Sequence, residues 1–539
     1  MSKKLWEASL SIKQKSNLFK FEKFLSKKFN YKINKNYSKL LKWSINNLDL
    51  FWSSVWDFTN VKGKKIDKFI HSKEFIKNKF FVKSKLNFAE NLLSKDDNTK
   101  AITFISENGH REIRSWKKLK SNTSKLINFF KKNNISEKDR IAAYMINQIE
   151  TVECFLASSS IGAIWSSCSP DFGTEGLIER FSQIKPKILI ITDRYYYNGK
   201  EINILERLPV ILDKIKSIKT VLVVNYPGKK YLKQKKIKGT RFYQLKKINK
   251  IKYEEIKFKR FDFDHELAIL YSSGTTGKPK CICHRSGGVL LQHLKEHKLH
   301  CEVKPGDNVF YFTTCGWMMW NWLLTFLASK ASIVLFDGFP MYKKDDLLLK
   351  IANDEKITLF GVSAKYIDQL KKKNIYIKSK FKLNKLKIIC STGSPLSGDN
   401  FQYVYDSIKK NVHLASIAGG TDLVGCLILG NLFSNVYKGE IQGQSLGIEV
   451  DIFNDFPFAT HNGELLNLDT HSFRFLLPDK RRPRKKGAPT KVVTIPTGIS
   501  AGMTTVLESK SAPTKRSAPN KAEAGSKIRL SGVLPSLIK

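Results

Sequence analysis

The chain has 539 residues, of which 42% are apolar, and it carries a formal net charge of +46. Its length exceeds what one hydrophobic core normally fills, so two or more domains are expected. The excess charge is almost all lysine, dispersed through nearly every segment, without the arginine clusters or aromatic signature of an RNA-binding surface before residue 480. The composition therefore favours anionic small-molecule ligands over nucleic acid.

Cysteine usage and hydropathy indicate a soluble protein of a reducing compartment, which we expect to be the cytoplasm. The eight cysteines include no C-x-x-C pair and show no disulfide-like spacing. The sequence Cys281-Ile282-Cys283-His284 lacks a second pair of metal ligands, so these residues are interpreted as part of a buried strand. The start of the chain has no apolar core of secretory length, and the apolar stretch at 320–328 is too short to span a membrane.

The first 95 residues are amphipathic and rich in lysine, with aromatic residues that are expected to pack on the main body. From 96 to 455 short apolar runs alternate with helical segments. The runs predicted as strands are 101–105, 141–145, 188–192, 221–225, 267–271, 332–336, 359–362 and 388–392. This rhythm is typical of parallel sheets covered by helices on both faces, so the fold class is predicted as α/β.

The segment YSSGTTGKPK, residues 271–280, follows one of these strands. Backbone amides, hydroxyls and an ammonium can converge in such a loop, as a polyphosphate requires, so ATP is the expected ligand. It is not a Walker loop, because Gly274 and Gly277 are three residues apart and Pro279 follows the lysine. The candidate ATP ligands of the loop are Ser272, Ser273, Gly274, Thr275, Thr276, Gly277 and Lys278.

Three further segments contain candidate site residues. TTCGWMMWNW (313–322) is rich in aromatic residues and methionine, STGSPLS (391–397) follows a predicted strand, and SIAGGTDLVG (416–425) contains Asp422. A carboxylate near phosphates is a suitable hard ligand for Mg²⁺, which makes Asp422 the candidate metal ligand. Taken alone, each segment also fits a purely structural role: core packing for the first and ordinary turns for the other two.

Together these segments resemble the acyl-adenylate-forming enzymes, the group of acyl-CoA synthetases, luciferases and nonribosomal adenylation domains. The resemblance implies the large, multi-subdomain N-terminal domain of the adenylate-forming fold, with parallel sheets sandwiched by helices. It assigns Thr421 to the α-phosphate and Asp422 to Mg²⁺, and both are carried over as catalytic residues. It also places Gly393, Ser394 and Pro395 against adenine and Gly420 in the ATP site.

The same resemblance locates an acid pocket lined by Trp317, Met318, Met319 and Gly419. In acetyl-CoA synthetases a tryptophan shortens the pocket at the place that matches Gly419. A glycine there implies room for a longer acid.

A closer resemblance covers residues 5–455 and leads to the acetoacetyl-CoA synthetases. It rests on LNFAENLL, SSCSPDFG, RYYYNGK, HRSGG and VWDF, which are residues 86–93, 166–173, 194–200, 284–288 and 55–58. It implies conversion of acetoacetate, ATP and CoA to acetoacetyl-CoA, AMP and diphosphate through an acyl-adenylate, with Mg²⁺ as cofactor. The alternatives are a ligase for another short or medium-chain acid and a noncatalytic nucleotide-binding remnant; the oligomeric state stays open.

The composition changes after about residue 455. Prolines crowd the segment 456–539, and arginines appear at 481–486. This composition predicts disorder, and a frame-shifted or wrongly joined reading of the gene is preferred over a nucleic-acid-binding tail. The family's small C-terminal domain and its catalytic lysine are not recognisable there, so the AMP-binding domain is interpreted as incomplete. We therefore expect weakened adenylation and almost no thioester formation.

Overall fold

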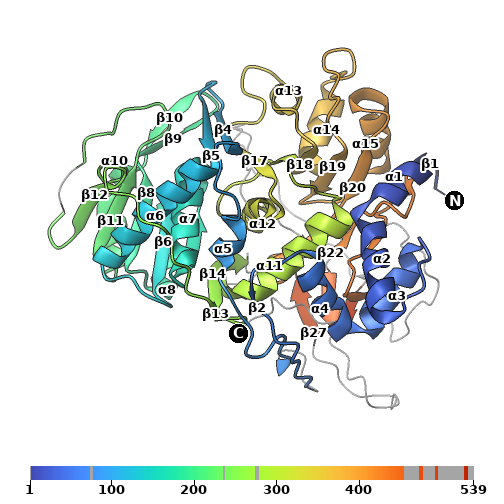
Figure 1. The fold of residues 1–539 in the computed structure, drawn as a ribbon. Helices are drawn as coiled ribbons and strands as arrows, with labels where there is room; N and C mark the ends of the chain where they lie inside the picture. The colour runs from blue at the N-terminus through green and yellow to red at the C-terminus, as the bar shows by residue number, and fades with distance from the viewer. Residues whose placement is uncertain are drawn as a thin grey trace, which may run out of the picture.

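The computed structural model describes residues 2–72, 77–234, 237–272 and 278–453, together with three short strands nearer the C-terminus. Two seven-stranded sheets form the body of the molecule (Figure 1). The first sheet has the order β12 (Arg241–Gln244), β11 (Thr220–Val224), β8 (Ile188–Thr192), β6 (Arg140–Tyr144), β7 (Ile164–Cys168), β14 (Glu266–Ser272) and β15 (Lys280–Arg285). Its strands pair in parallel except β14 and β15, which form an antiparallel edge.

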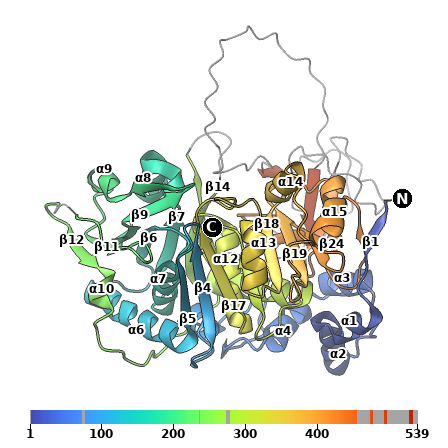
Figure 2. The same cartoon turned by 90° about the horizontal axis from the view of Figure 1, so that it is seen from above.

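The second sheet repeats this plan. Its order is β20 (His413–Ser416), β19 (Ile388–Thr392), β18 (Leu359–Ser363), β16 (Asn308–Tyr311), β17 (Ser332–Asp337), β4 (Lys100–Ser106) and β5 (Arg111–Ser115). Only the edge pair β4 and β5 is antiparallel. Figure 2 shows β4 and β5, in blue, on the side of this sheet that faces the first.

Helices cover both sheets, as the alternating pattern predicts. They are α6 (Trp116–Lys132), α7 (Ile149–Ser160), α8 (Gly173–Ile184), α9 (Leu208–Lys214), α10 (Leu245–Ile248), α12 (Met318–Thr325), α13 (Leu347–Asp354), α14 (Ala364–Lys372) and α15 (Gly398–Tyr403), with short 3₁₀ turns at Pro170–Phe172, Leu205–Arg207 and Phe326–Ser329 and a π-helical turn at Val404–Ile408. Helix α7 contacts both β7 and β4, so it lies between the two sheets. None of the described helices is both long enough and apolar enough to cross a bilayer.

The N-terminal region packs on the centre of the molecule. It contains β1 (Lys4–Trp6), α1 (Leu10–Lys15), α2 (Asn17–Phe29), α3 (Tyr37–Asn46), α4 (Leu48–Phe58), β2 (Gly63–Lys64), β3 (Lys85–Leu86) and α5 (Phe88–Leu92). Figure 1 shows α2 and α4 beside α11 (Ser286–Lys295), which continues into a π-helical turn at Glu296–His300. The aromatic residues Phe51 and Trp52 are fully buried, as expected for residues that join this region to the main body.

A smaller three-stranded sheet adjoins the C-terminal end of the second sheet. It consists of β21 (Ala418–Gly420), β22 (Gly425–Leu429) and β24 (Gly443–Gln444). Four short strands complete the pairs outside the main sheets: β9 (Arg194–Tyr197), β10 (Lys200–Asn203), β13 (Phe261–Asp262) and β23 (Val436–Tyr437). Most of 456–539 lies outside the described residues; β26 (Phe473–Leu476), β27 (Val492–Ile495) and β28 (Lys527–Ser531) are described and form a sheet with β25 (Glu449–Phe453). The expectations about this segment and the domain boundaries stay predictions.

The eight predicted strands are confirmed to within one residue at each end. Among the strands of the two large sheets, the sequence missed β5, β7, β12, β16 and β20. The predicted strand at Cys281–His284 is also confirmed as β15, but its expected burial is wrong for Cys281, which is exposed. The reason is that β15 forms the edge of its sheet, so only its alternate residues face the core.

Candidate active site

The predicted phosphate loop connects two antiparallel strands. Strands β14 and β15 pair up to Ser272 and Lys280, which lie opposite each other at the loop end of the hairpin. Ser272 is half-buried and Lys278 is exposed, one on each side of the loop. The central loop ligands lie outside the described residues: Ser273, Gly274, Thr275, Thr276 and Gly277. Their phosphate contacts stay predictions.

The predicted magnesium residue lies on a tight turn between β21 and β22. The amide of Leu423 donates to Gly420 O at 3.2 Å, and that of Val424 donates to Thr421 O at 3.2 Å. Partial burial raises the pKa of Asp422, and Lys280 lies close enough for its ammonium to lower that pKa in part. The structure therefore brings this turn, residues 421–424, next to the strand that leaves the phosphate loop.

The predicted adenine segment lies at the same edge. Gly393 follows β19 with φ of +89°, a conformation that glycine adopts readily, and Ser394 and Pro395 are exposed. The hydroxyl of Thr392 donates to Ile417 O at 2.8 Å, and the amide of Ile417 donates to Ser391 O at 2.8 Å. These bonds hold the end of β19 against the residue that precedes β21. The predicted adenine segment and the strand that leads to Asp422 therefore begin side by side.

The predicted acid-pocket residues on α12 are largely part of the core. Trp317 precedes the helix and is half-buried, with its ring 6.2 Å from that of Tyr311. Met318 and Met319 are 6% and 2% exposed and belong to the largest hydrophobic cluster. The loop before the helix packs tightly, because a Cβ on Gly316 would lie 2.9 Å from the Phe172 ring. Contact of these side chains with an acid stays a prediction.

Gly419 is required by the backbone of the small sheet. A Cβ at this position would lie 2.0 Å from Gly425 O and 2.8 Å from Cys426 Cα on the opposite strand. A Cβ added at the neighbouring Gly420 would have Asp422 Oδ2 as its nearest neighbour, at 3.9 Å. Close approach of the strands is therefore sufficient reason for a glycine at 419, and its role in acid length stays a prediction.

Sequence reasoning missed helix α11, which supports the turn that carries Asp422. Helix α11 begins at Ser286, directly after β15, and all its residues are buried. The side chains of His293 and Glu296 reach the backbone of the turn and of β22. The available signal was a run of polar and ionisable residues, Gln292 to His300, within an otherwise apolar helix.

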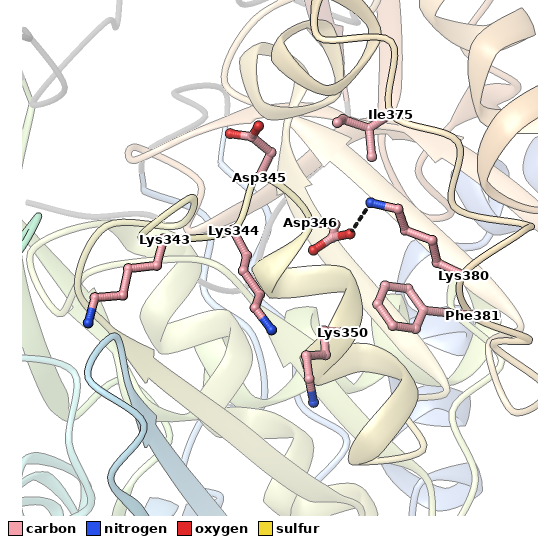
Figure 3. Close-up of a pocket in the computed structure, with 8 residues that line it drawn as sticks. All are labelled: Lys343, Lys344, Asp345, Asp346, Lys350, Ile375, Lys380 and Phe381. Atoms are coloured by element: carbon pink, nitrogen blue, oxygen red, sulfur yellow. Dashed lines mark hydrogen bonds and ion pairs between the residues drawn. The ribbon is translucent and has the colours of Figure 1, made fainter.

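A separate hollow of about 520 Å³ lies on another part of the surface (Figure 3). It is lined by Lys343, Lys344, Asp345, Asp346, Lys350, Ile375, Lys380 and Phe381. Lys380 pairs with Asp346 at 2.7 Å across it. None of the predicted site residues lines this hollow, and its paired charges leave it no evident chemistry.

Comparison with known proteins agrees with this geometry. The model of the AMP-binding enzyme family matches residues 90–463. The chain belongs to this family. Acetoacetyl-coenzyme A synthetase of Rhizobium meliloti (strain 1021) is 40% identical over 465 residues, covering 86% of this chain and 71% of the relative. Acetoacetyl-CoA synthetase of Gallus gallus is 39% identical, covering 80% of this chain and 66% of the relative.

A solved structure supports the same family at the level of the fold. Acetoacetyl-CoA synthetase from Streptomyces lividans superposes with a TM-score of 0.78 at 28% identity, covering 84% of this chain and 70% of that one. The predicted α/β adenylate-forming fold is thereby confirmed, as is membership of the AMP-forming acid–CoA ligases among the AMP-binding enzymes. The chain spans about two-thirds of the length of these relatives, so the activity of the whole protein is a proposal.

Proposed function

We propose that this member of the AMP-binding enzyme family is an acetoacetate:CoA ligase. In the first step an acetoacetate carboxylate oxygen bonds to the α-phosphorus of ATP, and the bond from that phosphorus to diphosphate breaks. In the second step the CoA thiol, having lost its proton, attacks the acyl carbon and releases AMP. The observation that carries the proposal is the 40% identity to an acetoacetyl-coenzyme A synthetase over 86% of the chain.

The arrangement of the segments suits the first step, in which positioning and electrostatics do most of the work. Ser272 and Lys278 lie at the ends of the loop proposed to hold the outer phosphates. Thr421 directly follows β21, and Thr392 at the end of β19 donates to Ile417 O just before β21, which supports a position of the α-phosphate near the proposed adenine segment. ATP would then lie across this edge with its α-phosphorus near Thr421.

Asp422 suits the proposed Mg²⁺. Its raised pKa reflects a carboxylate that burial has partly deprived of water, and a cation would stabilise its ionised form. Magnesium bound there would neutralise charge on the phosphates. Lys280 already supplies one positive charge to this carboxylate in the free protein.

The acid substrate is proposed to carry a carbonyl at its third carbon. Malonamoyl-CoA synthetase vrtB of Penicillium aethiopicum is 32% identical over 497 residues, which cover 86% of this chain. Malonamate differs from acetoacetate by an amino group in place of the terminal methyl group, and both have a 3-oxo group. Acetoacetate is preferred over malonamate because the acetoacetyl relatives are the more similar, at 36–40% identity.

A diphosphate-exchange assay with a panel of acids tests this function. Acetoacetate should give the highest exchange rate, malonamate a lower one, and butyrate and acetate, which lack the 3-oxo group, at least tenfold lower rates, or about 1.4 kcal/mol. The rate with acetoacetate should fall at least tenfold in Asp422→Asn. Asp399→Asn is the matched control, because Asp399 is exposed and pairs only with surface lysines.

Two outcomes would contradict the proposal. A preference for butyrate or acetate would favour a ligase for another short acid. ATP binding without exchange for any acid in the panel would favour a noncatalytic nucleotide-binding protein.

A further inference from the structure

The turn that carries Asp422 contains an unfavourable backbone conformation. Val424 has φ of +48°, in the left-handed region that β-branched residues rarely adopt. Its side chain is 1% exposed and packs in the main core. Such a conformation persists only where the surroundings hold it in place.

A buried histidine holds this residue. His293 Nε2 lies 2.6 Å from Val424 O, and its Nδ1 lies 2.8 Å from Thr325 Oγ1. A carbonyl oxygen can only accept, so Nε2 carries the proton. Burial lowers the pKa of His293 to about 3, so the ring is neutral at physiological pH. His293 thus provides a fixed, uncharged donor that points at the turn.

A buried carboxylate fixes Cys426, the second residue of β22 after the turn. Glu296 Oε1 accepts from the Cys426 amide at 2.8 Å and from Gln292 Nε2 at 2.6 Å. Its Oε2 accepts from Trp322 Nε1 at 2.7 Å. Lys295 Nζ lies 3.9 Å from the same carboxylate, and both side chains are fully buried. Three donors and one cation therefore determine the position of Glu296.

Helix α11 packs directly on the hairpin backbone. A Cβ on Gly425 would lie 2.7 Å from Gln292 Nε2 and 2.9 Å from Glu296 Oε1, so no side chain could be inserted between them. The helix also follows β15 without an intervening residue, and β15 is the strand that leaves the phosphate loop. One buried helix therefore contacts both the strand that leaves the predicted phosphate loop and the turn that carries Asp422, and Figure 1 shows it in the centre of the molecule.

We propose that His293 and Glu296 are positioning residues, which hold the 421–424 turn, and with it the Asp422 carboxylate, next to β15. This inference rests on the proposed function, since it assigns Asp422 to magnesium-bound ATP. The two side chains act through Val424 and Cys426 and touch neither ATP nor acid. Their loss should therefore weaken the contribution of Mg²⁺ to ATP binding more than ATP binding itself.

The test is calorimetric titration of the full chain with ATP, once with excess Mg²⁺ and once with EDTA. We expect His293→Gln to lower affinity for ATP with Mg²⁺ at least fivefold, while affinity in EDTA changes less than twofold. His300→Gln is the matched control, because His300 is an equally buried histidine with Nδ1 3.0 Å from Gly430 O, beyond the far end of β22. It should melt at a lower temperature but keep the wild-type ratio of the two affinities.

The outcomes separate the inference from the function on which it rests. Wild-type protein that gains no affinity from Mg²⁺ would overturn both. If Mg²⁺ raises ATP affinity by the same factor in the wild type and in folded His293→Gln, the inference alone is overturned. Glu296→Gln, which retains one acceptor oxygen, serves if His293→Gln does not fold. Amide exchange in the wild type needs no variant: rapid exchange at Cys426 would contradict a turn held in place.

Discussion

At the scale of single residues, the candidate site combines chemical groups with backbone requirements. Asp422 contributes a carboxylate whose pKa burial has raised, whereas Gly419 contributes only the absence of a side chain. The two lie three residues apart, yet Asp422 is proposed to bind a ligand, whereas Gly419 is required by the opposite strand. A glycine in a family motif therefore does not by itself indicate contact with substrate.

Two glycine substitutions separate these roles. Gly419→Ala should destabilise the protein by about 1–3 kcal/mol, because its Cβ would meet Gly425 O at 2.0 Å. Gly420→Ala, whose nearest neighbour is at 3.9 Å, should change the free energy of unfolding by less than about 0.5 kcal/mol. Thermal and denaturant unfolding of both variants measures this difference. Equal stability of the two would show that the small sheet relaxes around a side chain at 419.

At the scale of elements, the site depends on the junction between β19 and the small sheet. The Thr392 hydroxyl bond to Ile417 O crosses from the strand that precedes the adenine segment to the residue before β21. It is a side-chain bond at the end of a parallel sheet, where backbone pairing stops at Ser391 and Ser416. The relative position of two ligand segments therefore depends on a few local contacts.

We expect Thr392→Val to weaken ATP binding about threefold to tenfold, since loss of a hydrogen bond of about 1 kcal/mol loosens this junction. Thr358→Val is the matched control. Its hydroxyl donates to Asn308 O at 3.1 Å before β18 in the same sheet, away from the predicted ATP segments. Both variants should lose similar stability in thermal melts, and only Thr392→Val should lose ATP affinity in calorimetry. Equal ATP affinity of the two would remove the junction from the site.

At the scale of the whole molecule, two sheets and a smaller third sheet converge on one edge. The phosphate loop comes from the first sheet, the adenine segment from the second and the magnesium turn from the third. Helix α11 links the first to the third. ATP bound at this edge should therefore stabilise the arrangement of all three sheets, since a ligand that binds the native state stabilises it.

The two half-reactions should differ in this chain. The expectation of weak adenylation and almost no thioester formation stays a prediction, because most residues after 455, where the family's catalytic lysine was not recognised, lie outside the described residues. Diphosphate exchange measures adenylation, and release of acetoacetyl-CoA measures thioester formation. The acetoacetyl-coenzyme A synthetase of Rhizobium meliloti is the reference. Thioester formation at a rate comparable with this relative would contradict the expectation.

Much of the fold could be predicted because its signals are local. Short apolar runs between helical segments identified eight strands. Hydroxyl and glycine residues after one of these strands predict a phosphate loop, which stays a prediction. The assignment of strands to sheets could not be predicted in this way. Strand β4 comes before every strand of the first sheet in the chain, yet it pairs with β17 of the second sheet, Ile102 opposite Ile333. Such pairings depend on packing between segments more than two hundred residues apart.

The sequence by itself determined the α/β class, because short apolar runs alternate with helical segments along the chain, whereas the ATP-binding segments and the acidic residue for Mg²⁺ stay predictions. Only the tertiary structure decided that Lys280 faces Asp422 and that His293 and Glu296 support the turn between them. The physical reason is burial. Whether a glutamate or histidine is a solvated surface residue or a fixed hydrogen-bonding partner depends on which elements cover it, and the chain must fold before that is decided.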